Sequence, residues 1–340
     1  MSDVSEKASS TVDEKPPAVQ TSPAKSSGGF PLDIRLTILF GVLIALCIVG
    51  YALNSTFLGE NNISIMLRLA AAIGVVSVGM TFVIISGGID LSVGSMVALS
   101  SVWMTTVATQ EYGPWVMVLC ALLVGLGAGL VNGVLIAYGK VVPFIATLAM
   151  YASARGLAER LSERQTQVVT QQDFSDFFRG AFLGIPVLIW MLAIVFAIGW
   201  IVLNRTTFGR RTFAIGGNAE AARLAGINVK LHTAMVYAIA GLCCGIAAIM
   251  VVARTTSGAS TNGMFYELDA IAAVVIGGTL LTGGRGTLIG TLIGVLIFTV
   301  VNSIFTQNNL ETDIQNIAKG VIIVGAVLLQ TLTSRRGSKT

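Results

Sequence analysis

Long apolar runs separated by short polar stretches make up the chain from residue 30 to residue 333. A helix needs about 20 apolar residues to cross the hydrocarbon core of a bilayer, so each run of that length predicts a membrane-spanning helix. The pattern predicts an all-α polytopic membrane protein with about ten transmembrane or re-entrant helices. The predicted segments are residues 32–53, 63–86, 90–108, 114–138, 142–161, 185–203, 233–254, 268–281, 286–305 and 314–332.

Two of these segments are weaker than the others. Arg155 and Glu159 enter the last turns of segment 142–161, and segment 268–281 is short and rich in glycine. A segment as short as 268–281 is more typical of a broken or re-entrant helix than of a full span. A division of the apolar runs into eight or nine spans is the main alternative topology.

Both ends of the chain are polar. Residues 1–29 are rich in Ser, Pro, Ala, Lys and Glu and carry almost no large apolar side chain, which predicts a disordered tail. They lack a basic region followed directly by an apolar region and a cleavage site, so a signal peptide is not predicted. Residues 334–340 form a second, short tail.

Composition supports the membrane class. Only 11% of the residues are charged, whereas a soluble domain has about 25%. The basic residues lie beside apolar runs and form no dense patch, so nucleic-acid binding is not predicted. The four cysteines all lie inside apolar runs, which predicts small core residues and no disulfides. They are Cys47, Cys120, Cys243 and Cys244.

The distribution of Lys and Arg predicts the orientation in a cell inner (plasma) membrane. Ten spans place both termini on one side, and cytoplasmic loops carry an excess of Lys and Arg. If the termini are cytoplasmic, Arg164 and Arg179 are the only basic residues of the outer segments. Those segments also carry several acidic residues. The termini and the loop 204–232 are therefore predicted to be cytoplasmic. Three arginines near outer helix ends are expected to snorkel to the interface. These are Arg68, Arg155 and Arg160.

The loop 204–232 is the longest clearly polar interruption between strongly apolar regions. Its middle predicts one short helix, with Asn218 as the N-cap after Gly216 and Gly217, Glu220 in the first turn, and Gly226 at the C′ position. A helix of two turns is not stable alone in water. It must therefore lie against the membrane surface, its own bundle or a partner protein.

Two glycine-rich breaks indicate a weak inverted repeat. The first break includes Gly87 and Gly88, and the second includes Gly283 and Gly284. The second to fifth spans begin outside, whereas the seventh to tenth begin inside. Inverted repeats with broken helices are typical of transporters and place the pathway at the repeat interface.

Placing a carboxylate at membrane depth costs free energy, so residues that do so are candidate functional groups. Asp90 follows the first break, where it is expected to cap a restarting helix. Glu267 and Asp269 open the eighth predicted span, where a carboxylate suits the positive end of a helix. No series of acids and histidines crosses the membrane interior, which argues against a proton relay. A structural or gating role is predicted for these residues.

Small residues recur on single helix faces. Glycines at positions 125, 127, 129 and 133, at 241 and 245, and at 286, 290 and 294 follow this pattern. Small faces let helices approach closely in lipid, so these glycines are predicted to pack helices together.

Catalytic and metal-binding motifs are missing. The chain has no G-x-x-x-x-G-K-[ST] phosphate loop, no H-E-x-x-H, no G-x-S-x-G and no C-x-x-C. The single His232 has no Cys/His cluster near it, so a structural role is predicted and no metal site. The chain is therefore not predicted to be an enzyme, and active transport would need an external source of energy.

Several long motifs, in order, resemble the membrane subunit of ribose-type ABC sugar importers. The resemblance covers roughly residues 30–333. The motifs are residues 78–81 (VGMT), 88–95 (GIDLSVGS), 144–148 (FIATL), 216–228 (GGNAEAARLAGIN), 266–279 (YELDAIAAVVIGGT), 283–287 (GGRGT) and 290–294 (GTLIG).

The resemblance implies an ABC importer permease-like fold and a homodimeric permease that moves a monosaccharide into the cytoplasm. It implies a cytoplasmic ATPase that binds ATP and Mg, an extracytoplasmic sugar-binding protein, and no cofactor in the permease itself. Whether the permease pairs with itself or with a sister subunit stays open, as does the sugar.

In such importers a short cytoplasmic helix sits in a groove of the ATPase and transmits its closure. The resemblance assigns this coupling role to the short helix of the loop 204–232, whereas the alternative is a helix that lies on lipid headgroups. Glu220 and Arg223 are three residues apart and therefore share one face. The coupling residues are Gly216, Gly217, Asn218, Glu220, Ala221, Ala222, Arg223 and Gly226.

Two further surfaces are expected from this resemblance. Outer loops 162–184 and 255–267 are expected to receive the loaded binding protein. Polar or aromatic residues within spans are predicted to line the pathway, because sugars need hydrogen-bonding groups and aromatic faces. They are Trp103, Asn132, Phe144, Thr147 and Asn302.

Three alternatives remain. A secondary transporter or channel would work alone, but it predicts coupling carboxylates within the bundle. An ABC permease of the same plan for a signalling furanose or a branched-chain amino acid would differ only in its cargo. A membrane enzyme is the least favoured, because catalytic groups are missing.

Overall fold

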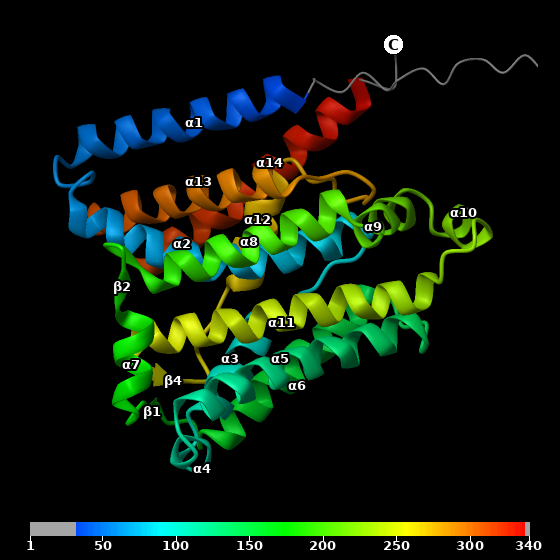
Figure 1. The fold of residues 1–340 in the computed structure, drawn as a ribbon. Helices are drawn as coiled ribbons and strands as arrows, with labels where there is room; N and C mark the ends of the chain where they lie inside the picture. Colours follow the sequence, from blue (N-terminus) through cyan, green and yellow to red (C-terminus); the bar gives the residue numbers. More distant parts are fainter. Residues whose placement is uncertain (1–31, 337–340) are drawn as a thin grey trace, which may run out of the picture.

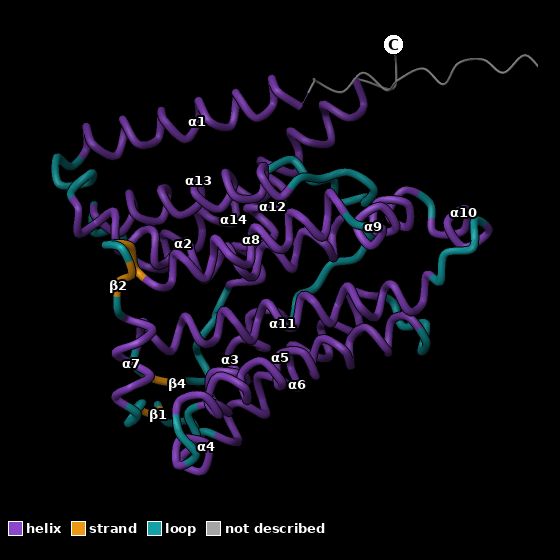
Figure 2. Tube along the Cα trace, in the orientation of Figure 1, coloured by secondary structure: helices purple, strands orange, loops and turns teal. Residues whose placement is uncertain are grey.

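The computed structural model describes residues 32–336, which form a helical bundle (Figures 1 and 2). The tail predicted over residues 1–29 and the final residues 337–340 lie outside the described residues. Residues 334–336 belong to the last helix and not to a separate tail. Within 32–336 the helices are α1 Leu32–Leu53, α2 Glu60–Ile85, α3 Val93–Met104, α4 Val107–Glu111, α5 Pro114–Ala137, α6 Pro143–Leu161, α7 Gln172–Arg179, α8 Val187–Arg205, α9 Thr207–Gly217, α10 Ala219–Leu224, α11 Val229–Thr255, α12 Tyr266–Ile276, α13 Leu288–Gln307 and α14 Thr312–Arg336.

Each of the ten predicted segments contains a helix, so the all-α polytopic fold is confirmed. Six helices of the described part are long and apolar enough to cross a membrane, namely α1, α2, α5, α8, α11 and α13. Helices α6 and α14 have 19 and 25 residues. The chain is therefore a multi-pass membrane protein.

Helices α3 and α12 are too short to cross the bilayer. They have 12 and 11 residues, which is roughly 16–18 Å at 1.5 Å per residue against a core of about 30 Å. The prediction of a short, broken helix over 268–281 is confirmed, whereas the prediction of a full span over 90–108 is wrong. Residues 88–92 are not helical, and a turn at Thr105 and Thr106 separates α3 from α4.

Helices α2 and α11 form the centre of the bundle. Most of their residues are buried, whereas few residues of α1 and α8 are buried. In a membrane, exposed apolar side chains face lipid without cost, because lipid tails are as apolar as leucine. Exposed apolar side chains on α1 and α8, such as Ile48 and Ile194, are therefore compatible with a membrane environment.

The bundle has two distinct ends (Figure 1). Helices α9 and α10 lie at one end, together with the start of α1 and the end of α14. The opposite end holds α4, α7 and the short strands, where β1 Gln167–Val168 pairs with β4 Ser257–Gly258 and β2 Ala181–Phe182 pairs with β3 Ile185–Pro186. Successive long helices connect these two ends, as the predicted topology requires.

The two short helices occupy equivalent places in the two halves. Helix α3 is second in the set α2, α3, α5 and α6, and α12 is second in the set α11, α12, α13 and α14. The glycine break precedes α3 and follows α12, and the two helices run in opposite directions along the bundle (Figure 1). This arrangement agrees with the inverted repeat inferred from the sequence.

Candidate functional site

Helices α9 and α10 project from one end of the bundle and are separated by the single residue Asn218. As predicted, Asn218 is the N-cap of α10, because its Oδ1 accepts a hydrogen bond from the backbone N–H of Ala221 at 2.9 Å. Gly226 follows the C-cap with φ of 84°, a conformation that glycine adopts without strain. The prediction of a single helix in this loop missed α9.

The outer surface of α10 combines a charged pair with an exposed leucine. Arg223 donates to both carboxylate oxygens of Glu220, at 2.6 Å and 3.0 Å, and both side chains are exposed. Those hydrogen bonds lower the pKa of Glu220 below its ordinary value, so the pair stays charged at neutral pH. Leu224 is 73% exposed, whereas Ala222 faces the bundle and is buried. The surface is suited to contact another molecule.

Three pairs of neighbouring glycines, far apart in the sequence, come together beside the end of α9. They are Gly87–Gly88 after α2, Gly216–Gly217 at the end of α9, and Gly283–Gly284 between α12 and α13. The backbone N–H of Gly284 donates to the carbonyl of Ile85 at 2.9 Å. This hydrogen bond joins the second glycine break to the end of α2.

The glycines allow the three backbones to touch directly. A Cβ at Gly283 would lie 2.9 Å from the carbonyl oxygen of Gly216 and 3.0 Å from the Cα of Gly87. A Cβ at Gly216 would overlap the carbonyl oxygen of Ile85 and lie 2.6 Å from the nitrogen of Gly284. We call Gly87, Gly216, Gly283 and Gly284 the glycine junction.

Asp90 is fully buried in the segment that leads from the first break to α3. Its Oδ1 accepts hydrogen bonds from the backbone N–H of Ser92 at 2.9 Å and from the Ser92 hydroxyl at 2.5 Å. The N-cap of α3 is Ser92 itself, so the prediction that Asp90 caps this helix is corrected. Asp90 instead holds the turn that immediately precedes α3.

Glu267 and Asp269 lie in the first turn of α12 and are both buried. Glu267 packs against Gly94 in the first turn of α3, so the starts of the two short helices adjoin. Asp269 forms an ion pair with Lys319 of α14, with Nζ–O distances of 3.2 and 3.4 Å. The sequence analysis did not identify Lys319, although a lone lysine inside a predicted span was a usable signal.

The five predicted pathway residues do not form one group. Asn132 and Thr147 are fully buried and donate to the Ser92 hydroxyl at 2.9 Å and to the Ile89 carbonyl at 3.4 Å. They therefore hold the non-helical segment before α3. Trp103, Phe144 and Asn302 lie elsewhere, on α3, α6 and α13, and the first two are exposed. The pathway role of these residues stays a prediction.

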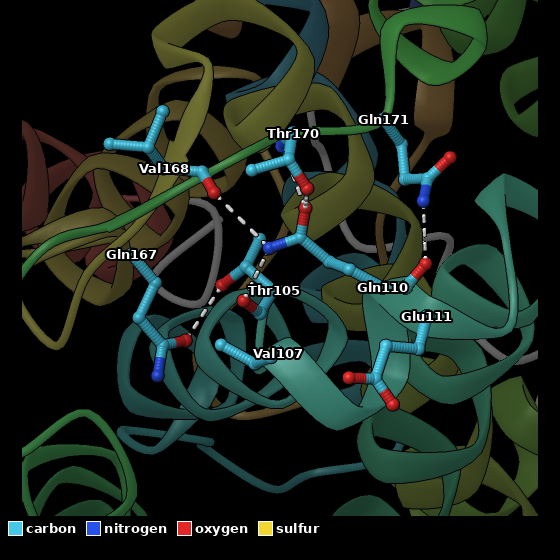
Figure 3. A pocket seen from close by; sticks show the side chains of 8 residues that line it. All are labelled: Thr105, Val107, Gln110, Glu111, Gln167, Val168, Thr170 and Gln171. Carbon is cyan, nitrogen blue, oxygen red and sulfur yellow. Dashed lines mark hydrogen bonds between the residues drawn. The ribbon is translucent and has the colours of Figure 1, made fainter.

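A polar network at the opposite end of the bundle is centred on Gln110 of α4 (Figure 3). Its side chain donates to the carbonyls of Thr105 and Val168, and it accepts from the backbone N–H and hydroxyl of Thr170 at 2.7 and 2.9 Å. These residues line a cavity of about 260 Å³. The loop 162–184 is thereby fixed to α4.

The two outer loops predicted to receive a binding protein are joined. Strands β1 and β4 pair Gln167 with Gly258 and Val168 with Ser257. Arg155 of α6 donates to the carbonyls of Ser260 and Asn262, so it holds loop 255–267. Because Arg155 fixes one loop and Gln110 the other, the two loops form one platform.

The comparisons with known proteins agree with this architecture. The family model described as "Branched-chain amino acid transport system / permease component" matches residues 62–329. The chain is 44% identical over 289 residues to the ribose import permease protein of Bacillus subtilis, which covers 84% of this chain and 90% of that protein.

Two more distant relatives carry other names. The L-arabinose ABC transporter permease protein of Azospirillum brasilense is 36% identical and covers 92% of each chain. The galactofuranose transporter permease protein of Escherichia coli is 33% identical and covers 78% of each chain. No solved structure matches this chain. The family match and these identities show that the chain belongs to the family of transport-system permease components described as branched-chain amino acid permeases.

Proposed function

We propose that this chain is the transmembrane permease subunit of an ATP-driven ABC importer that carries a monosaccharide, ribose or a similar pentose or hexose, into the cytoplasm. The observation that carries this proposal is the 44% identity to a ribose import permease over 84% of the chain. Two further relatives are named for L-arabinose and galactofuranose, and these names also favour a sugar as the cargo.

The energy comes from a separate ATPase that binds ATP and Mg. Within the described residues no cluster of His, Cys, Asp and Glu is suited to hold a metal ion, and the sequence has no phosphate loop. We expect the permease to contribute a path and a docking surface, and the resemblance to ABC importers implies no cofactor of its own. A homodimer of this chain, embedded in lipid, binds two ATPase subunits.

The end of the bundle that carries α9 and α10 faces the cytoplasm, together with both termini. Arg205, Arg210, Arg211, Arg223 and Lys230 all belong to this end, as the excess of cytoplasmic Lys and Arg predicts. The opposite end, with the platform held by Gln110 and Arg155, receives the sugar-binding protein.

Helix α10 docks on the ATPase through Glu220, Arg223 and Leu224. An exposed leucine beside a charged pair offers an apolar anchor together with orienting charges. ATP binding closes the ATPase dimer and displaces α10. Because ATP binds one state of the complex more tightly than the other, it shifts the permease between its inward and outward openings.

Reversal of one charge tests the docking. In Arg223→Glu, two acids three residues apart repel each other and the partner site meets a charge of the wrong sign. We therefore expect a loss of co-purified ATPase of at least about tenfold. The exchange Glu220→Arg with Arg223→Glu restores the pair within the helix and is expected to remain defective. Undiminished co-purification in both variants would count against docking through this face.

A branched-chain amino acid is the second candidate cargo, because the matching family model carries that description. A thermal-shift screen of the cognate binding protein with ribose, L-arabinose, galactose and leucine separates the two. Stabilisation by a sugar alone is expected, and stabilisation by leucine alone would replace the proposed cargo.

A further inference from the structure

We propose that the glycine junction transmits the displacement of α10 to both short helices, α3 and α12. This inference rests on the proposed function, because it requires that the ATPase moves α10. It assigns to the two glycine breaks a positioning role within the transport cycle.

The first part of the route runs from α10 to the junction. Helix α9 ends at Gly217 and α10 begins at Ala219, so Asn218 is the whole connection between them. The other end of α9 is also held, because Phe208 packs on His232 of α11 with ring centroids 4.3 Å apart. A displacement of α10 therefore reaches Gly216 through α9, whose other end is held in place by α11.

The second part of the route consists of main-chain contacts between glycines. The atoms in contact at Gly87, Gly216 and Gly283 are main-chain atoms, and a Cβ at Gly216 would overlap the carbonyl oxygen of Ile85. Side chains can absorb a small displacement by changing rotamer, whereas close-packed main chain transmits it. A shift of Gly216 must therefore move the end of α2 and the second break.

The third part of the route connects the breaks to the short helices. Residues 88–92 lead from Gly87 to α3, and residues 277–282 connect α12 to Gly283. The two short helices meet at their N-terminal ends, where Glu267 packs against Gly94. One displacement at the junction therefore acts on both short helices. Helix α3 contacts α11 and α12 contacts α2, so each short helix also touches the other half of the bundle.

The test adds one methyl group at the junction. Gly216→Ala introduces a Cβ that overlaps the carbonyl of Ile85, whereas Gly127→Ala adds the same group to α5 with nothing within 4 Å. The readout is the rate of maleimide labelling at a Trp103→Cys substitution in α3, with the four native cysteines replaced. The full complex with its ATPase is measured in proteoliposomes, with and without ATP and vanadate.

We expect ATP and vanadate to change the labelling rate at least threefold in the parent and in Gly127→Ala, and to leave it unchanged in Gly216→Ala. Co-purification of the ATPase should stay normal in all three. A full ATP response in Gly216→Ala would overturn the inference. A parent complex that does not assemble would overturn the proposed function, and this inference with it.

A second variant covers the possibility that Gly216→Ala fails to fold. Insertion of Gly-Ser-Gly between Gly217 and Asn218 keeps the junction, the N-cap and α10 intact but makes the connection flexible. We expect normal assembly with the ATPase and a loss of the ATP-dependent labelling change. A preserved response with this insertion would also overturn the inference, because the signal would then bypass α9.

Discussion

Lys319→Met is expected to destabilise the folded permease by about 3–5 kcal/mol, the range measured when one partner of a buried ion pair is removed. The variant leaves the Asp269 carboxylate buried without its cation, since Lys319 Nζ lies 3.2 Å from that carboxylate and both side chains are largely buried. In a membrane the charge cannot escape to water, which adds to the penalty. Thermal unfolding of the purified protein in detergent measures the loss.

The matched control removes both charges. The double variant Asp269→Leu with Lys319→Met replaces the ion pair by apolar side chains of similar size, and such replacements are often neutral. We therefore expect the double variant to recover most of the stability lost in Lys319→Met. If Lys319→Met alone unfolds like the parent, the ion pair does not hold α14 to α12.

Gly241→Val is expected to reduce the yield of folded protein at least tenfold, because it separates α5 from α11. A Cβ at Gly241 would overlap the carbonyl of Gly125 and lie 2.8 Å from the Cα of Gly129. Overpacking a core costs about 1–3 kcal/mol when side chains can rearrange. Here the obstacle is main chain, which cannot rearrange without moving a helix. Fluorescence-detected size exclusion of a tagged protein measures the folded yield.

Gly127→Val is the matched control for this contact. Gly127 lies in the middle of α5, but a Cβ there meets no atom within 4 Å. The change in helix propensity is the same in both variants, so a difference between them reports packing. Equal yields for Gly241→Val and Gly127→Val would show that the close approach of α5 and α11 does not limit folding.

Hydropathy predicted the long helices well because length and apolarity alone define them. The prediction of residues 32–53 matches α1 at both ends. The same criterion failed for residues 90–108, where an apolar run contains a non-helical segment, a 12-residue helix and a separate turn of helix. Asn132 and Thr147 bind polar groups of this segment, and those contacts come from other helices.

The local geometry of the candidate site was also predictable, whereas its long-range contacts were not. Asn218 and Gly226 mark the two ends of α10, and the contacts that determine these ends lie within a few residues of them. Helix α9 was missed because its glycines disfavour an isolated helix, and packing on His232 overrides that preference. The pairing of Asp269 with Lys319, 50 residues later, and the meeting of the glycine breaks depend on tertiary structure.

The sidedness of α10 tests the account most directly. Leu224→Cys in α10 and Phe182→Cys at the opposite end both replace exposed side chains. In a background without native cysteines, each is treated with a membrane-impermeant maleimide in intact cells and in inverted membrane vesicles. The account predicts that Phe182→Cys is labelled in intact cells and Leu224→Cys only in inverted vesicles. Labelling of Leu224→Cys in intact cells would place α10 outside, where no ATPase could act on it, and would contradict the account.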